Sequence, residues 1–343
     1  MDLNFVCRQR AIAAATCLVA MAGTTTALHA ADVAPAAEAS SLSVQFVETF
    51  NKLSSGPHAG YRANHAKGIL VTGSFTPAKG AAELSVAPHF AQPVAVTARF
   101  SDPTGVPTMP DASPNASPHG LAIRFELPGG SNADMVCISA HSFPVARPED
   151  FLQMLQAVAA SGPDVAKPKP IEKFLGEHPA AAKWVSTPRP APVSFATLGF
   201  YGVNAFKFTN AAGTVRYARY EIVPDAGQAA LTAEQAAAAD PDYLMKELPQ
   251  RIARGPVRFH LYAQVAGADD AINDATVEWP AQRERIELGT LSLDAVVPDQ
   301  ATAQKSLLYF DPLALPQGID PSDDPILLAR PPAYAVSFGQ RMQ

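Results

Sequence analysis

Short stretches in which hydrophobic and polar residues alternate recur along the chain, and this pattern predicts β-strands. Gly, Pro, Asp and Asn residues separate the stretches and favour turns. Four short strands on either side of a helical region are typical of an antiparallel barrel with helices outside it. A barrel of about eight strands either packs its own side chains or encloses a small ligand, and the pattern leaves both open. The eight predicted strands are residues 67–75, 94–101, 120–127, 134–139, 204–210, 214–224, 257–266 and 285–294.

Hydrophobic residues at helical spacing predict helices in three other regions. A helix is expected over residues 41–55, and another over 147–161, where acidic residues occupy the first turn. Residues 231–255 predict two helices. Residues 162–192 are rich in proline and show little periodicity, so a long connection without regular structure is expected there.

The N-terminus has the pattern of a secretory signal. Arg8 and Arg10 precede an apolar run, residues 11–23, that is too short to span a bilayer and ends in small residues. We therefore expect a signal peptide over 1–30, a flexible leader over 31–40, and one domain over 41–343 in the periplasm. A retained anchor helix is the alternative.

Composition narrows the class of function. The chain of 343 residues carries 26 Lys and Arg and 32 Asp and Glu. Removal of residues 1–30 takes away two of the former and one of the latter, which leaves 24 − 31 = −7. This charge argues against nucleic acid or an anionic membrane as partner. Cys137 would be the one remaining cysteine, so neither an internal disulfide nor a cysteine-ligated metal cluster is expected.

Two segments contain candidate chemistry. The first, RANHAKG (62–68), places His65 between Arg62 and Lys67, and an exposed loop or a buried structural histidine would also explain it. In the second, Arg330 and Tyr334 are four residues apart, a spacing that brings guanidinium and phenol together on a helix. A neighbouring arginine favours the phenolate, which suits ferric iron. The chain lacks the motifs of serine hydrolases, zinc proteases and phosphate-binding loops, and its histidines are too scattered for a mononuclear metal site.

Together these segments resemble the haem catalases, and most of all the small exported catalase-related peroxidases. The likeness runs from about residue 41 to the end of the chain. It implies an α+β fold, an eight-stranded antiparallel β-barrel of the haem catalase type with surrounding helices. The segments that carry it, besides RANHAKG, are ARFSDPTG (98–105), SPHGLAIRF (117–125), DMVCISAHSFPVARPEDF (134–151) and YFDPLALPQGIDPSDDPILLARPPAY (309–334).

The resemblance also implies roles for individual residues. His65 matches the distal acid–base that moves the peroxide proton, and Ser101 matches the hydroxyl that fixes its ring. Tyr334 matches the axial ligand to the iron of haem b, and Arg330 the arginine that keeps this tyrosine ionised. The remaining matches are to residues around the macrocycle: Arg62, Arg99 and Arg341 to the arginines on the haem propionates, and Phe143 and Phe151 to aromatic residues beside the haem.

Several positions depart from the catalase pattern. Ile138 is expected where catalases have a distal asparagine, and it cannot donate a hydrogen bond. Asn64 replaces an apolar residue, and Asn204 stands where catalases have a histidine behind the proximal arginine, so weaker support of Arg330 is expected. Pro331 and Pro332 fall inside the proposed proximal helix, which must either kink or start afresh there.

The function implied by the resemblance is a haem peroxidase that reduces hydrogen peroxide or organic hydroperoxides with a small organic donor. Because of Ile138, weak catalase activity is expected. The long arms of full catalases are missing, so a monomer or homodimer is expected, without a membrane partner once the signal is removed. The alternatives are a hydroperoxide isomerase resembling allene oxide synthase, and a non-enzymatic periplasmic barrel that binds haem or another apolar ligand.

Overall fold

A computed structural model describes residues 34–307 and 309–343. The expected signal peptide and the first residues of the expected leader lie outside the described residues. The first helix, α1, spans Ala34–Leu53 and so begins before the predicted start at residue 41. Its first turns are rich in alanine, the residue with the highest helix propensity, which explains the earlier start.

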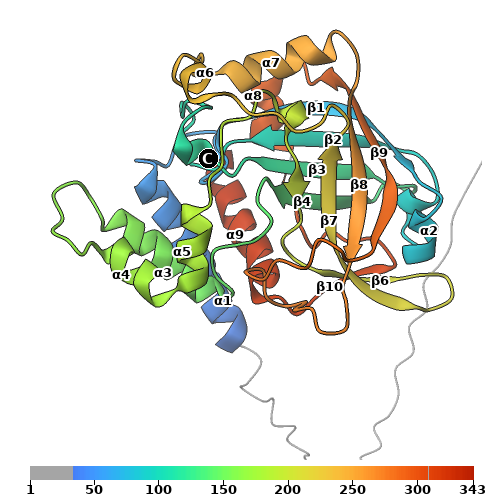
Figure 1. The fold of residues 1–343 in the computed structure, drawn as a ribbon, viewed down its shortest axis with the longest axis horizontal. Coiled ribbons are helices and arrows are strands. Elements are labelled where there is room, and N and C mark those ends of the chain that lie inside the picture. Colours follow the sequence, from blue (N-terminus) through green and yellow to red (C-terminus); the bar gives the residue numbers. More distant parts are fainter. Residues whose placement is uncertain (1–33, 308) are drawn as a thin grey trace, which may run out of the picture.

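The sheet closes on itself as an antiparallel barrel (Figure 1). The strand order is β10-β6-β7-β5-β4-β3-β2-β1-β9-β8, and pairing between β7 and β8 closes it. All eight predicted strands are present, and two short strands, β5 and β10, are additional. The strands are β1 (Gly68–Pro77), β2 (Val94–Ser101), β3 (Gly120–Glu126), β4 (Asn132–Ile138), β5 (Phe200–Tyr201), β6 (Phe206–Thr209), β7 (Val215–Pro224), β8 (Val257–Val265), β9 (Arg285–Val296) and β10 (Ile319–Pro321).

Strands β5 and β6 form one interrupted strand along the same edge of β7. Phe200 and Tyr201 pair with β7 near its end, and Phe206 to Thr209 pair with its beginning. Gly202 still donates to the Tyr220 carbonyl at 2.8 Å, and residues 203–205 leave the ladder. Counted in this way, and without the short β10 that pairs only with β6, the barrel has eight strands. The interruption is the place from which Asn204 reaches the site described below.

The barrel interior is filled by its own side chains. Phe100 on β2 stacks on Phe195 at 5.1 Å and contacts Phe200 at 5.7 Å. Residues on either side of Phe100 point to the opposite face of the strand, because side chains alternate along a strand. Space for a ligand therefore lies outside the packed interior. The largest fully buried aromatic side chains are Phe75, Phe100, Phe125, Phe195, Phe200, Phe208 and Phe259.

Helices cover two sides of the barrel (Figure 1). The C-terminal helix α9 (Pro325–Met342) packs against α1, and α1 packs against α3 (Pro148–Ala159). At another end lie α6 (Ala233–Ala237) and α7 (Tyr243–Ile252), the two helices predicted there. Three smaller elements are α2 (Ala81–Leu84), α8 (Gln300–Thr302) and the π-helical turn Ala303–Leu307, and 3₁₀ turns occupy Pro88–Phe90, Pro114–Ala116 and Phe195–Thr197.

The prediction of an irregular connection over 162–192 was wrong. Two helices, α4 (Pro170–Glu177) and α5 (Pro179–Ser186), lie inside it. Both start with proline, which breaks a helix interior but is favoured in the first turn. Phe174 and Ala181 bury their side chains against α3 and the start of α9. No helix in the described part of the chain combines the length and the hydrophobicity that a membrane span needs.

Helix α9 runs through Pro331 and Pro332 without a second start. Its N-cap is Asp324, whose carboxylate accepts a hydrogen bond from the Ile326 amide at 2.9 Å. The two prolines have no N–H, so the carbonyls one turn earlier lose their helical donors. The Pro331 carbonyl accepts a hydrogen bond from the Tyr309 hydroxyl at 2.9 Å, and this bond connects the helix to the segment that precedes β10.

Candidate active site

A cavity of about 260 Å³ lies between the barrel wall and helices α1, α3 and α9. The strand register builds one of its walls. Ser101, Gly120, Ile138 and Tyr201 stand opposite one another across β2, β3, β4 and β5. Arg99, Ala122 and Val136 form the next row of the same face. All nine predicted site residues line this cavity: Arg62, His65, Arg99, Ser101, Phe143, Phe151, Arg330, Tyr334 and Arg341.

His65 sits in an uncommon backbone conformation, with φ = 55°. A non-glycine residue holds the left-handed region only where its surroundings fix it. The Arg99 guanidinium does so by donating to the carbonyls of His65 at 2.9 Å and Ala66 at 3.1 Å. The His65 ring is fixed by a hydrogen bond of 3.0 Å between its Nδ1 and the Ser101 hydroxyl. The predicted pairing of His65 with Ser101 is thus present in the structure.

The electrostatics of the site keep His65 neutral. Burial, and then the positive charges of Arg99 and Arg62, lower the pKa of His65 to about 3. His119 and Arg330 add smaller contributions in the same direction. A neutral imidazole retains a lone pair that accepts a proton, so His65 can act as a base at any pH well above 3.

Several guanidinium groups gather around the cavity without a carboxylate on its described wall. Burial, followed by the charges of Arg99 and Arg341, lowers the pKa of Arg62 well below its usual value. Burial and Arg341 lower the pKa of Arg99 to about 9, and burial lowers that of Arg341 to about 10. Positive groups that repel one another in a buried site favour the binding of an anion, which relieves this repulsion. The cavity is therefore suited to a ligand with carboxylates.

Arg330 and Tyr334 meet on one face of α9. Arg330 donates to the Tyr334 hydroxyl oxygen from Nε at 3.2 Å and from Nη2 at 3.1 Å. Its third nitrogen, Nη1, donates to the Asn204 side-chain oxygen at 2.8 Å. Two donors on one phenol oxygen stabilise negative charge there.

Asn204 links Arg330 to a buried acid. Its amide group donates to the carboxylate of Asp324 at 2.8 Å while its oxygen accepts from Arg330. Asn204 and Asp324 are both buried. The buried acid at the start of α9 thus orients the amide, which orients the guanidinium. Arg330 is therefore held from the side opposite Tyr334 by a buried hydrogen-bond chain.

Aromatic side chains form the rest of the wall. Phe143 and Phe151 contact each other at 4.8 Å, as expected for residues that shape one pocket. Phe46 and Phe50 of α1 join them, at 5.8 and 6.3 Å from the Phe151 ring. The hydrophobic spacing over residues 41–55 predicted the helix that carries both phenylalanines, and nothing in the sequence separated a core from a ligand cavity.

Other predicted positions have mixed outcomes. Ile138 and Asn64 both line the cavity, and Ile138 offers no hydrogen bond. His89 is buried and stacks on Phe125 at 4.7 Å. His119 is also buried, where its Nδ1 lies 2.8 Å from an Asp102 carboxylate oxygen. Sequence reasoning missed this pair, because the partners are far apart in the sequence and only the β2–β3 register joins them.

Comparison with known proteins shows which family the chain belongs to. The family model described as catalase matches residues 35–342. The chain belongs to the catalase family. It is 34% identical to a catalase-related peroxidase from Synechococcus elongatus, over 83% of the chain and 85% of that protein. A catalase-related peroxidase from Mycolicibacterium paratuberculosis is 35% identical, over 83% and 90% of the two chains. Members of this family are oxidoreductases that act on peroxide.

The fold comparison agrees. Catalase A from Saccharomyces cerevisiae superimposes with a TM-score of 0.73, over 83% of this chain and 62% of the yeast chain, at 23% identity. A fungal catalase superimposes with the same TM-score at 24% identity. The predicted eight-stranded barrel of the catalase type is thus confirmed. Full-length catalases, such as one from Vibrio vulnificus at 27% identity, match over only 56% of their own length.

The family implies haem, and the residues of the cavity fit that group. Tyr334, with two arginine donors on its oxygen, is a suitable anionic ligand for ferric iron. Arg62, Arg99 and Arg341 are suitable partners for two propionates, since the described wall holds no acid to neutralise them. The aromatic wall suits the flat apolar macrocycle.

Proposed function

We propose that this protein is a haem-dependent peroxidase that reduces hydrogen peroxide or organic hydroperoxides with a small organic electron donor. Haem b is held by Tyr334 and the arginines of the cavity in this proposal. One observation carries it: a neutral His65 and an Arg330-supported Tyr334 line the same cavity. The names of the two catalase-related peroxidases point in the same direction.

Each residue then has a defined task. When bound, haem supplies the iron at which the O–O bond of the peroxide is broken. His65 takes the proton from the bound peroxide and returns it to the leaving oxygen, and Ser101 keeps its ring in place. Arg330 and Asn204 hold negative charge on Tyr334. Overall, two electrons and two protons from the donor convert the hydroperoxide into an alcohol and water.

Weak catalase activity is part of the proposal. Catalase turnover requires a second hydrogen peroxide to be oriented and oxidised in the same cavity. Ile138 presents only carbon atoms to this space, so it contributes no donor to a second peroxide. The organic donor is therefore expected to supply most of the electrons.

The first experiment measures peroxide consumption and oxygen release by the haem-loaded protein, with and without a phenolic donor. Consumption that requires the donor, with little oxygen, supports the peroxidase. Rapid oxygen release without the donor contradicts the weak catalase activity. Conversion of a fatty-acyl hydroperoxide without any donor favours the isomerase instead.

His65→Ala separates the enzymes from a simple binding protein. The variant should retain stoichiometric haem and lose at least about 100-fold in donor-dependent turnover, the usual size of an acid–base contribution. Retained haem without activity in the unmodified protein would favour a haem-binding barrel. We also propose export to the periplasm through residues 1–30 and a monomeric or dimeric state. N-terminal sequencing of the exported protein and its mass in solution test these two points.

A further inference from the structure

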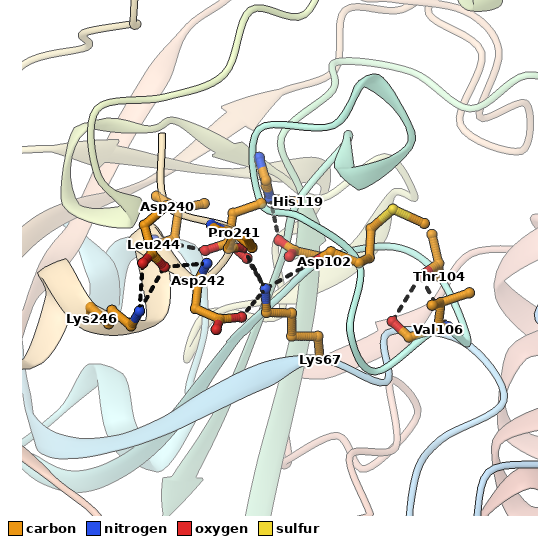
Figure 2. A network of polar contacts seen from close by, with 12 residues as sticks. Lys67, Asp102, Thr104, Val106, His119, Asp240, Pro241, Asp242, Leu244 and Lys246 are labelled. Atoms are coloured by element: carbon orange, nitrogen blue, oxygen red, sulfur yellow. Dashed lines mark hydrogen bonds and ion pairs between the residues drawn. The ribbon is translucent and has the colours of Figure 1, made fainter. Parts of the chain in front are cut away.

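Lys67 is the last residue of the RANHAK segment (62–67), and its side chain is buried in a cluster of acceptors (Figure 2). Its ammonium lies 2.5 Å from an Asp111 oxygen and 2.7 Å from an Asp242 oxygen. It also donates to the carbonyls of Met109 at 2.8 Å and Pro241 at 2.9 Å. The Lys67 side chain is only 8% exposed and that of Asp111 is fully buried, so water screens this pair weakly, whereas Asp242 is half-exposed. Lys67 thus has charged partners in a buried position.

The partners come from two segments that are distant in the sequence. Asp111 lies in the loop between β2 and β3, and Asp242 is the residue before α7. Asp111 also binds this helix directly, because its second oxygen accepts a hydrogen bond from the Leu244 amide at 2.7 Å. Its own amide donates to the Pro241 carbonyl at 2.9 Å. Lys67 and Asp111 together therefore fasten the segment after His65 to the start of α7.

Two carboxyl groups, those of Asp102 and Asp111, lie next to each other in this cluster. The buried Asp102 carboxyl lies against Asp111, and its other side contacts His119. Burial, and then the nearby Asp102 carboxyl, raise the pKa of Asp111 to about 6, although Lys67 acts in the opposite direction. Asp242 faces the same ammonium from the start of α7. The charge of Asp111 also acts on Tyr243 and Lys246 of this helix. Lys67 contacts the carboxylates of Asp111 and Asp242 directly.

The backbone links this cluster to His65. The Lys67 carbonyl accepts from the Asp102 amide at 3.1 Å, and the Ala66 amide donates to the Thr104 carbonyl at 2.8 Å. Together with the Arg99 bonds to the His65 and Ala66 carbonyls, these contacts hold three consecutive residues. A left-handed residue persists only where its neighbours are held in this way.

We infer that Lys67 is a positioning residue for His65: its ion pairs with Asp111 and Asp242 hold the segment that keeps the His65 ring on Ser101. The inference rests on the proposed role of His65 in the reaction. Lys67 does not line the cavity, so it acts through the backbone and not on the substrate.

Lys67→Met, which keeps the length of the side chain and removes its charge, is the first variant. It should lower donor-dependent peroxide turnover by roughly 10- to 100-fold, the loss expected when a catalytic group shifts by about an ångström. The ¹⁵N resonances of the His65 ring in the haem-free full chain should move, because the hydrogen bond to Ser101 changes. Lys246→Met is the matched control, since Lys246 pairs with Asp240 in the same view but is exposed. It should change neither readout.

A double variant separates positioning from simple stability. Lys67→Met alone leaves buried carboxylates without a cation and lowers the unfolding temperature. Lys67→Met with Asp111→Asn removes that uncompensated charge, while the asparagine oxygen still accepts from Leu244. The double variant should recover most of the unfolding temperature but keep the lowered turnover and the shifted His65 resonances.

Two results would overturn the inference. One is recovery of turnover together with stability in the double variant, which would give Lys67 a purely structural role. The other is unchanged His65 resonances in Lys67→Met. The resonances are measured without haem or peroxide, so they still test the positioning role if the protein proves to have no peroxidase activity.

Discussion

The Arg330 guanidinium donates two hydrogen bonds, from Nε and Nη2, to the single hydroxyl oxygen of Tyr334. The spacing of four residues on α9 makes this geometry possible. Two donors on one oxygen leave it suited to carry negative charge, which an iron ligand requires.

Replacing Arg330 with Met should therefore weaken the ligand without removing it. We expect Arg330→Met to bind haem with an altered absorption spectrum, and Tyr334→Phe, which lacks the oxygen, to lose the spectral bands of tyrosinate ligation. Absorption spectra of both haem-loaded variants check this. An unaltered spectrum in Tyr334→Phe would show that another residue ligates the iron.

Gly120 gives the His65 ring its space. A Cβ at this position would lie 2.9 Å from the ring carbon Cε1 and 2.8 Å from the Ser101 hydroxyl. Gly120→Ala should displace the ring and reduce turnover by roughly 10- to 100-fold. Gly176→Ala on α4 is the control, since a Cβ there meets nothing within 4 Å. It should leave turnover unchanged and stabilise the helix by about 0.5–1 kcal/mol. Equal turnover in the two variants would argue against a steric role for Gly120.

The depressed pKa of His65 predicts a pH dependence of stability. In the folded haem-free chain the pKa is about 3, whereas an unfolded histidine titrates near ~6.5. Between these values the unfolded state binds more protons, so His65 favours unfolding increasingly as the pH falls from about 6.5 toward 3.

His65→Gln removes this titration. The free energy of unfolding of the haem-free wild type should fall relative to that of His65→Gln as the pH is lowered through this window. Above the window the difference should be constant. Denaturant titrations of both proteins at several pH values measure it, and the buried His89 cancels because both chains contain it. A difference independent of pH would mean that the folded and unfolded His65 titrate alike.

Local patterns in the sequence predicted the barrel, whereas the residues of the site came from the resemblance to the catalases. Strand alternation marked all eight long strands, since burial of one face imposes period two on the residues. The prolines at 170 and 179 were misleading, because the same residue ends one helix and starts another. No pattern in residues 324–328 indicated that the Asp324 carboxylate would accept a hydrogen bond from Asn204. That contact depends on the interruption between β5 and β6, which no local pattern encodes.

The contact between Asn204 and Asp324 leads to the last prediction. Both side chains are buried, so Asn204→Ala leaves one Asp324 oxygen and one Arg330 nitrogen without a partner. The loss of a buried hydrogen-bond partner costs about 1–3 kcal/mol, and charged groups lie at the upper end. We expect a decrease of this size in the free energy of unfolding, together with the same spectral change as in Arg330→Met. The exposed Asn132→Ala should show neither effect, and a stable Asn204→Ala with an unaltered spectrum would mean that Arg330 holds Tyr334 without help.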